Sequence, residues 1–198
     1  MPLTSYAIRT FISEKVTEVT SSGATDVAIE FPGAIEWLSR FALVAMLRNH
    51  VHEQSRPFAI QFLRRSSAAL AEYSRAKVEL DHFVDGGHGQ WSPYFRALYH
   101  FEAAISQLYQ AWDLCRKWTN TSLFESNDGG FFDRLNKIYN CHRHVVATTD
   151  QPLWITNGGL ACESSQVTFA EIEDALRRLC RIAERLTTAK PAPSESDA

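Results

Sequence analysis

The sequence lacks the short motifs that most directly indicate redox or nucleotide chemistry. It has four widely spaced cysteines that form no C-x-x-C pair, Cys115, Cys141, Cys162 and Cys180. We therefore expect reduced thiols that pack in or near the core of a cytosolic protein. The glycine cluster at 86–89 is not a phosphate-binding loop, because no lysine follows it and no strand precedes it. We interpret it as the end of a helix.

Long apolar runs and a strong net charge are also missing. No uninterrupted apolar stretch approaches the roughly 18 residues that a membrane span needs. The first 16 residues contain no basic segment followed by an apolar one, so we expect no secretory signal and a cytoplasmic location. The formal net charge is −3. This charge gives no general attraction to nucleic acid or anionic lipid, so any such contact would need a local patch.

A metal site is not indicated either. His50 and His52 are two residues apart on an expected helix and so point in different directions. A histidine pair that binds zinc from a helix needs the four-residue spacing of H-E-x-x-H. We therefore expect no metal and no cofactor.

What the sequence does contain is a helical pattern. Hydrophobic residues make up 45% of the 198 residues and aromatic residues 12%, enough for a sizeable core. The spacing predicts a mainly all-α protein, a bundle of about six helices with a short β-hairpin before the last one. We expect a single helical domain over 1–188, with additional helices in 1–90, a core in 92–188 and a disordered tail at 189–198. The expected helices are 5–20, 34–54, 58–84, 93–118, 131–148 and 169–186, and the hairpin spans 152–162 with a turn at Asn157-Gly158-Gly159.

The fifth expected helix carries the one group of residues that suggests chemistry. Asn140 and His144 are four residues apart, so both project from the side opposite the apolar stripe of that helix. A histidine near its ordinary pKa of about 6.5 can donate or accept a proton near neutrality. The neighbouring amide can orient the imidazole or a phosphate. A solvated helix face with an incidental histidine is the alternative.

The fourth expected helix offers a second polar stripe. Glu102, Ser106, Tyr109 and Asp113 recur every three or four residues along it, after Tyr99. If this edge faces the fifth helix, its polar groups can hydrogen-bond Asn140 or His144. Ordinary partial exposure of the stripe is the alternative.

Together these segments resemble the HEPN superfamily, helical domains of prokaryotic toxin–antitoxin and defence systems. The resemblance rests on the aromatic and acidic helix from Tyr99 to Asp113, on Asn140-x-x-x-His144, and on the hairpin before a capped last helix. It implies RNA or nucleotide chemistry without metal in a cleft shared by two protomers, with a homodimer as the working state. In active members an arginine precedes the polar residue of the motif. Tyr139 stands at that position here.

The arginine is missing, and a phenol supplies no fixed positive charge to a reacting phosphate. Our main hypothesis is a non-catalytic HEPN-like module that binds a partner protein or RNA, with Tyr139, Glu102, Tyr109 and Asp113 as candidate binding residues. The alternative is a metal-independent endoribonuclease in which His144 is the general acid/base and Asn140 and Arg143 position the phosphate. A third hypothesis is a small-ligand bundle with Trp112, Trp118, Tyr99 and Tyr109 around an internal pocket.

Overall fold

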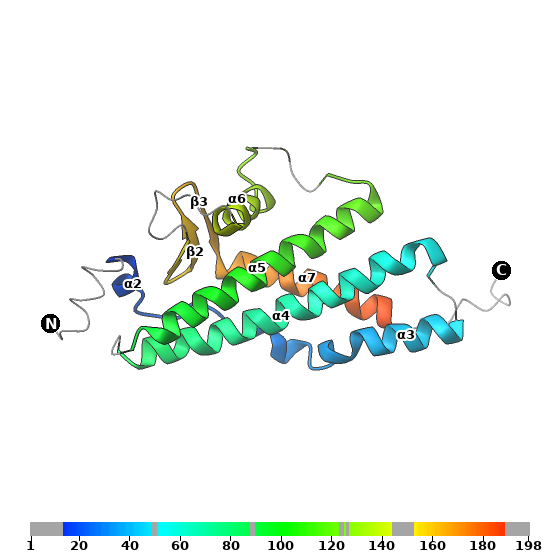
Figure 1. Cartoon of the computed structure of the whole chain (residues 1–198), viewed down its shortest axis with the longest axis horizontal. Helices are drawn as coiled ribbons and strands as arrows, with labels where there is room; N and C mark the ends of the chain where they lie inside the picture. The colour runs from blue at the N-terminus through cyan, green and yellow to red at the C-terminus, as the bar shows by residue number, and fades with distance from the viewer. Residues whose placement is uncertain are drawn as a thin grey trace.

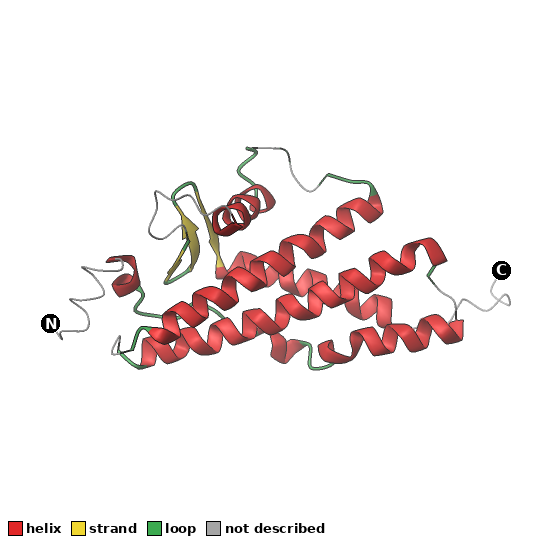
Figure 2. Cartoon of the chain, in the orientation of Figure 1, coloured by secondary structure: helices red, strands yellow, loops and turns green. Residues whose placement is uncertain are grey.

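The computed structural model describes residues 14–48, 51–87, 90–122, 125, 127–143 and 153–188, and of residues 14, 47, 48, 142 and 143 only the backbone. Those ranges hold six α-helices, α2 to α7, and a three-stranded antiparallel sheet just before the last helix. The mainly helical bundle with a hairpin before its last helix is therefore confirmed (Figure 2). No helix in the described part of the chain combines the length and apolarity that a bilayer crossing requires.

Two long antiparallel helices form the body of the molecule (Figure 1). Helix α4 spans Arg56–Asp85 and α5 spans Ser92–Thr119, and each has a proline in its first turn. Proline is tolerated there because the first helical N–H groups have no partner inside the helix. Gly86 ends α4, and Gly87 follows with a φ of 58° that favours glycine. The helix begins one residue before the expected 93, at Ser92, and Trp91 occupies the N-cap position without a side-chain cap.

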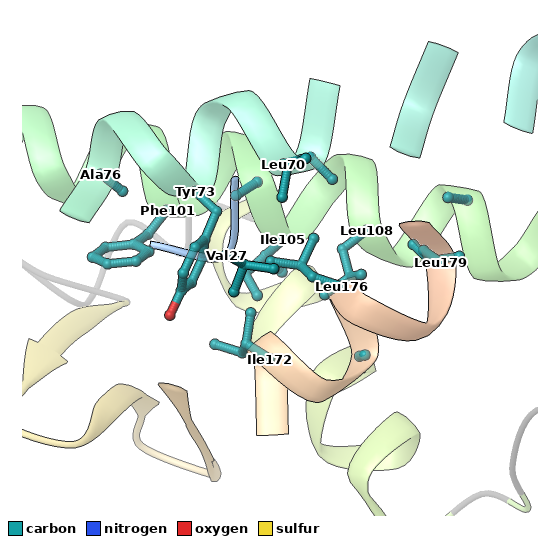
Figure 3. Packing of buried hydrophobic residues seen from close by; sticks show 14 of the residues in the cluster. Val27, Leu70, Tyr73, Ala76, Phe101, Ile105, Leu108, Ile172, Leu176 and Leu179 are labelled. Atoms are coloured by element: carbon teal, nitrogen blue, oxygen red, sulfur yellow. The ribbon is translucent and has the colours of Figure 1, made fainter. Parts of the chain in front are cut away.

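Helix α7, Phe169–Thr187, packs against both long helices and completes the core. Its start was predicted correctly: the Thr168 hydroxyl accepts from the Glu171 N–H, and the Glu171 carboxylate accepts from the Thr168 N–H. Figure 3 shows Ile172 and Leu176 of α7 beside Ile105 and Leu108 of α5 and Tyr73 of α4. Apolar residues from three helices therefore meet in one layer.

The N-terminal third contributes shorter elements. They are α2 (Glu14–Glu18), the 3₁₀ turns η1 (Val27–Glu30), η2 (Ala34–Glu36) and η3 (Glu53–Ser55), and α3 (Trp37–Arg48). The expected helix over 34–54 is therefore too long. His52 has an extended ψ of 139°, and its imidazole Nδ1 accepts from the Gln54 N–H to open η3. An extended residue cannot continue an α-helix, so the chain turns here before α4.

The sheet contains one strand more than expected. Strands β1 (Trp154–Thr156) and β2 (Gly159–Cys162) form the predicted hairpin, and β3 (Ser165–Thr168) pairs with β2. Helix α6 (Phe131–Arg143) packs beside the sheet, and both lie on the side of α5 away from α3 (Figure 1). The predicted continuation of α6 to residue 148 lies outside the described residues.

Candidate functional site

The loop before α6 and the first turn of that helix are held by a buried aspartate. Asp133 is 2% exposed, and its carboxylate accepts from the backbone N–H groups of Asn127 (3.1 Å) and Gly129 (3.3 Å). Lys137, one turn later, donates to it at 2.9 Å. These donors, Lys137 first, hold the pKa of Asp133 below its usual value. The start of α6 is thus fixed by local contacts.

A single arginine then ties α6 to the sheet and to α7. Arg134 donates to the Gln166 carbonyl at 2.9 Å and to both carboxylate oxygens of Glu171, at 2.5 and 3.2 Å. Glu171 also completes the capping box of α7. The Arg134 guanidinium, with the Thr168 donors, lowers the pKa of Glu171 to about 2 although partial burial opposes ionisation. We name this ion pair the Arg134–Glu171 clasp.

The face of α6 that meets α5 is aromatic. The rings of Tyr109 and Tyr139 are stacked, with centroids 4.6 Å apart and planes inclined by 20°. One helical turn further along α5, Trp112 meets Phe132 edge-on at 5.2 Å. Tyr139 is 7% exposed, so its ring is part of the packed interface. The contact between the two helices is therefore built from stacked rings.

Asn140 lies next to this aromatic contact, at its half-buried edge. Its Nδ2 donates to Oδ1 of Asn136, one turn earlier on the same helix, at 3.3 Å. The backbone of Arg143 ends α6, but its side chain and all of His144 lie outside the described residues. Of the predicted catalytic residues, the structure thus places the Asn140 side chain alone.

In the polar stripe of α5, Asp113 and Ser106 are bonded to residues of their own helix, and Glu102 behaves differently. Asp113 is paired on its own helix, at 2.7 Å from Lys117 and 2.8 Å from Arg116. Although partial burial works against the charged form, these cations hold the pKa of Asp113 below its usual value. Ser106 accepts from Gln110 at 3.0 Å. The expected hydrogen bonds from this stripe to Asn140 are not formed among the described side chains.

Glu102 differs from Asp113. It is half-buried, and neither a hydrogen bond nor an ion pair joins it to another described side chain. Burial raises its pKa to about 7, so the carboxyl titrates close to neutrality. Glu102 lies seven residues before Tyr109, two helical turns along the same face. Burial also raises the pKa of Tyr109, and nearby Asp113 adds to the effect. A proton-exchanging carboxyl therefore lies on the face of α5 that carries the stacked tyrosine.

Two of the four aromatics in the small-ligand hypothesis do share a cavity. A cavity of ≈ 380 Å³ is lined by Trp112 and Trp118 together with apolar residues of α4 and α7. Tyr99 and Tyr109 are not among its lining residues, and Tyr99 is 66% exposed. The lining residues are Phe62, Trp112, Cys115, Arg116, Trp118, Thr119, Thr121, Ile182 and Leu186.

One buried polar cluster, around Glu173, was not predicted from the sequence. Glu173 of α7 is 5% exposed, and its carboxylate accepts from the Tyr73 hydroxyl at 2.9 Å and from the Thr25 N–H and hydroxyl at 2.7 and 2.6 Å. Burial raises the pKa of Tyr73, and the adjacent carboxylate adds to this. The cluster joins α4, α7 and the N-terminal loop, and its position inside the core indicates a structural role.

Metal ligands do not gather anywhere in the described ranges: no group of three or more histidine, cysteine, aspartate or glutamate side chains there is placed to hold an ion. All four cysteines are free thiols. In comparisons with known proteins, no family model matches the sequence, no curated protein matches it, and no solved structure matches the fold.

Proposed function

We propose that this chain is a non-catalytic, HEPN-like interaction module that works as a homodimer and binds a partner protein or RNA, in a setting of prokaryotic RNA metabolism or defence. The observation that supports the non-catalytic assignment is the Tyr109–Tyr139 stack. At the position where active members of the family carry arginine, this chain has a buried aromatic ring that holds two helices together.

The charges on α5 and α6 support the same proposal. Cleavage of RNA without metal needs a cation beside the phosphate as negative charge develops. All described lysine and arginine side chains of these two helices are already in ion pairs, with Asp113, Asp133, Glu171 or Glu79. Glu102 adds a carboxyl whose ionised form repels a phosphate. A phosphate would therefore find little stabilisation from these described side chains.

The experiment is a cleavage assay on single-stranded RNA with EDTA present. We expect the wild-type chain and His144→Ala to leave the RNA equally intact. Cleavage by the wild type that His144→Ala abolishes and Asn140→Ala weakens would overturn the proposal. A Tyr139→Arg variant, checked for folding by circular dichroism, tests whether the cation alone restores activity.

Binding is measured separately, by anisotropy of the same RNA carrying a fluorescent label. Tyr99 is the most exposed aromatic residue on α5 and can stack on a base. RNA binding that Tyr99→Ala weakens, with no cleavage, identifies RNA as the partner. Val78→Ala, a change at an exposed apolar residue of α4, is the matched control.

The second candidate function is the metal-independent endoribonuclease. The observation that favours it is the carboxyl of Glu102, because a pKa of about 7 suits a general acid or base. In that case His144 is the first proton-transfer group, and Asn140 and Arg143 hold the phosphate. The cleavage assay separates the two candidates directly, since only this one predicts a metal-independent product.

A further inference from the structure

Helix α3 buries one face and leaves large apolar side chains on the other. Trp37 and Phe41 are each 2% exposed and anchor the helix to the core. On the opposite face, Ile35 in η2 is 87% exposed and Met46 is 83% exposed. Leu43 and Leu38, at 59% and 41%, flank them. We name Ile35, Leu38, Ser39, Ala42, Leu43 and Met46 the α3 face.

Side chains of similar size recur in reverse order along this α3 face. About a point midway between Arg40 and Phe41, Ile35 is equivalent to Met46, Leu38 to Leu43, and Ser39 to Ala42. If a second copy of α3 lies antiparallel across this point, each residue faces its paired residue in the other copy, for example Ile35 of one copy and Met46 of the other. Contacts of this reciprocal kind define an interface with two-fold symmetry. The small residues Ser39 and Ala42 lie at the centre, where two helices must approach most closely.

The charges on this face fit a second copy better than a charged partner. Glu36 and Arg40 are the only charged residues between positions 35 and 47, and they pair with each other at 2.6 Å. A neutral patch does not repel its own copy. It also gives no electrostatic attraction to RNA, to an acidic protein or to anionic lipid.

From these observations we propose that the α3 face is the interface between two copies of this chain, paired antiparallel. Full burial of the exposed apolar side chains removes roughly 500 Å² per copy from water, which places the dimer at the small, weak end of protein interfaces. The assignment does not depend on whether α5 and α6 bind or cleave RNA. It also differs from the shared cleft that the family resemblance implies. Helices α3 and α6 lie on opposite sides of the long helices, so α6 lies away from the proposed interface (Figure 1).

The first test is the oligomeric state of the full chain by sedimentation velocity, from about 1 µM to about 500 µM, a range that suits a weak dimer. We expect the wild type to pass from monomer to dimer as the concentration rises. Met46→Glu should raise the dissociation constant at least about tenfold, because it brings a charge into an apolar contact. Val78→Glu, at a residue of α4 that is 46% exposed, is the matched control and should leave the dimer unchanged.

The second test is the antiparallel order. Ile35→Cys and Met46→Cys proteins are mixed and treated with a short bismaleimide, with the wild type as the blank for native thiols. The mixture should give a cross-linked dimer. Ile35→Cys alone should give none, because the two copies of residue 35 are about 16 Å apart along the axis of an antiparallel pair.

Three outcomes would overturn the proposal. They are a monomer at every concentration, a dimer that Met46→Glu leaves intact, and self-cross-linking of Ile35→Cys. Monomeric protein that binds neutral phosphatidylcholine vesicles would instead assign the α3 face to a lipid surface. None of these results depends on RNA cleavage or binding, so the α3 interface and the non-catalytic assignment fail separately. A monomer at every concentration would also remove the homodimer from the proposed function, whereas the cleavage assay would be unaffected.

Discussion

Glu102 combines partial burial with a carboxyl that has no partner among the described side chains. Its pKa of about 7 lies above the ordinary value of 4.5. The folded chain therefore holds this proton more tightly than the unfolded chain. Burial of the ionised form costs stability, and this cost is absent below about pH 4.5 and complete above about pH 7.

We therefore predict that Glu102→Gln stabilises the protein at pH 8 and has little effect at pH 4. The gain in free energy of unfolding should be at most about 3 kcal/mol, and smaller to the extent that water reaches the carboxyl. Urea denaturation of both proteins at the two pH values measures it. An equal effect at pH 4 and pH 8 would contradict the assigned titration.

Glu173 is also a carboxylate of the core, but its two oxygens accept hydrogen bonds from three donors. We predict that Glu173→Gln lowers the free energy of unfolding by about 2–4 kcal/mol, because an amide cannot accept from all three donors. A double-mutant cycle with Tyr73→Phe should show coupling. The neighbouring Asp174→Asn is the control: that side chain is 57% exposed, so its pair with Arg178 should contribute less than about 1 kcal/mol. Equal losses at 173 and 174 would show that the buried cluster adds nothing.

At the scale of elements, the Arg134–Glu171 clasp joins α6, β3 and the start of α7. Its carboxyl has a pKa of about 2 in the folded chain, below the ordinary 4.5. The clasp therefore contributes stability above about pH 4.5, and this contribution is lost as the pH falls toward 2.

We predict that Glu171→Gln costs about 1–2 kcal/mol at pH 7, a value reduced because a third of the side chain is exposed. The difference from wild type should shrink between pH 4.5 and pH 2. Thermal unfolding of both proteins over this range tests it, with Asp174→Asn again as the control. A difference that is constant with pH would contradict the assignment.

The hairpin turn contains two glycines with different surroundings. A Cβ added to Gly159 would lie 2.0 Å from the Val167 carbonyl oxygen, while one added to Gly158 would meet no atom within 4 Å. We predict that Gly159→Ala forces β2 and β3 apart and lowers the free energy of unfolding by at least about 3 kcal/mol. Gly158→Ala should change it by less than about 1 kcal/mol. Urea denaturation compares the two, and similar losses would show that the sheet adapts.

For the whole molecule, the parts that sequence reasoning predicted are those with local causes. The prolines at 57 and 93 start the long helices, and the Thr168 and Glu171 pair starts α7. Strand β3 has one buried apolar residue in four, too few to show an alternation, and it depends on pairing with β2. The burial of Glu173 likewise depends on Tyr73, 100 residues earlier.

The candidate site was predictable to a similar extent. Tyr109 was identified from its helical face and Tyr139 from its place beside Asn140 in the motif resemblance, and the structure brings the two rings together. Asp113 was expected to reach toward the fifth helix, but Arg116 and Lys117 compete for it at i+3 and i+4 spacing. His144 lies outside the described residues. Its placement relative to Asn140 stays a prediction.

The distribution of burial also predicts how stability varies across the fold. The middle of α4 buries a residue at nearly every turn and packs against both α5 and α7. Among the α3 side chains that the structure describes, the large buried ones are Trp37 and Phe41. Local opening is easiest where few apolar contacts must break. In dilute, monomeric protein, we therefore predict that the amides of 41–48 exchange with deuterium faster than those of 66–80.

At concentrations that favour the dimer, exchange over 41–48 should slow while exchange over 66–80 stays the same. Hydrogen exchange with mass spectrometry at two protein concentrations measures both segments in one experiment, with Met46→Glu as the monomeric control. If α3 in dilute protein were as protected as α4, its attachment to the core would be stronger than its two anchors explain.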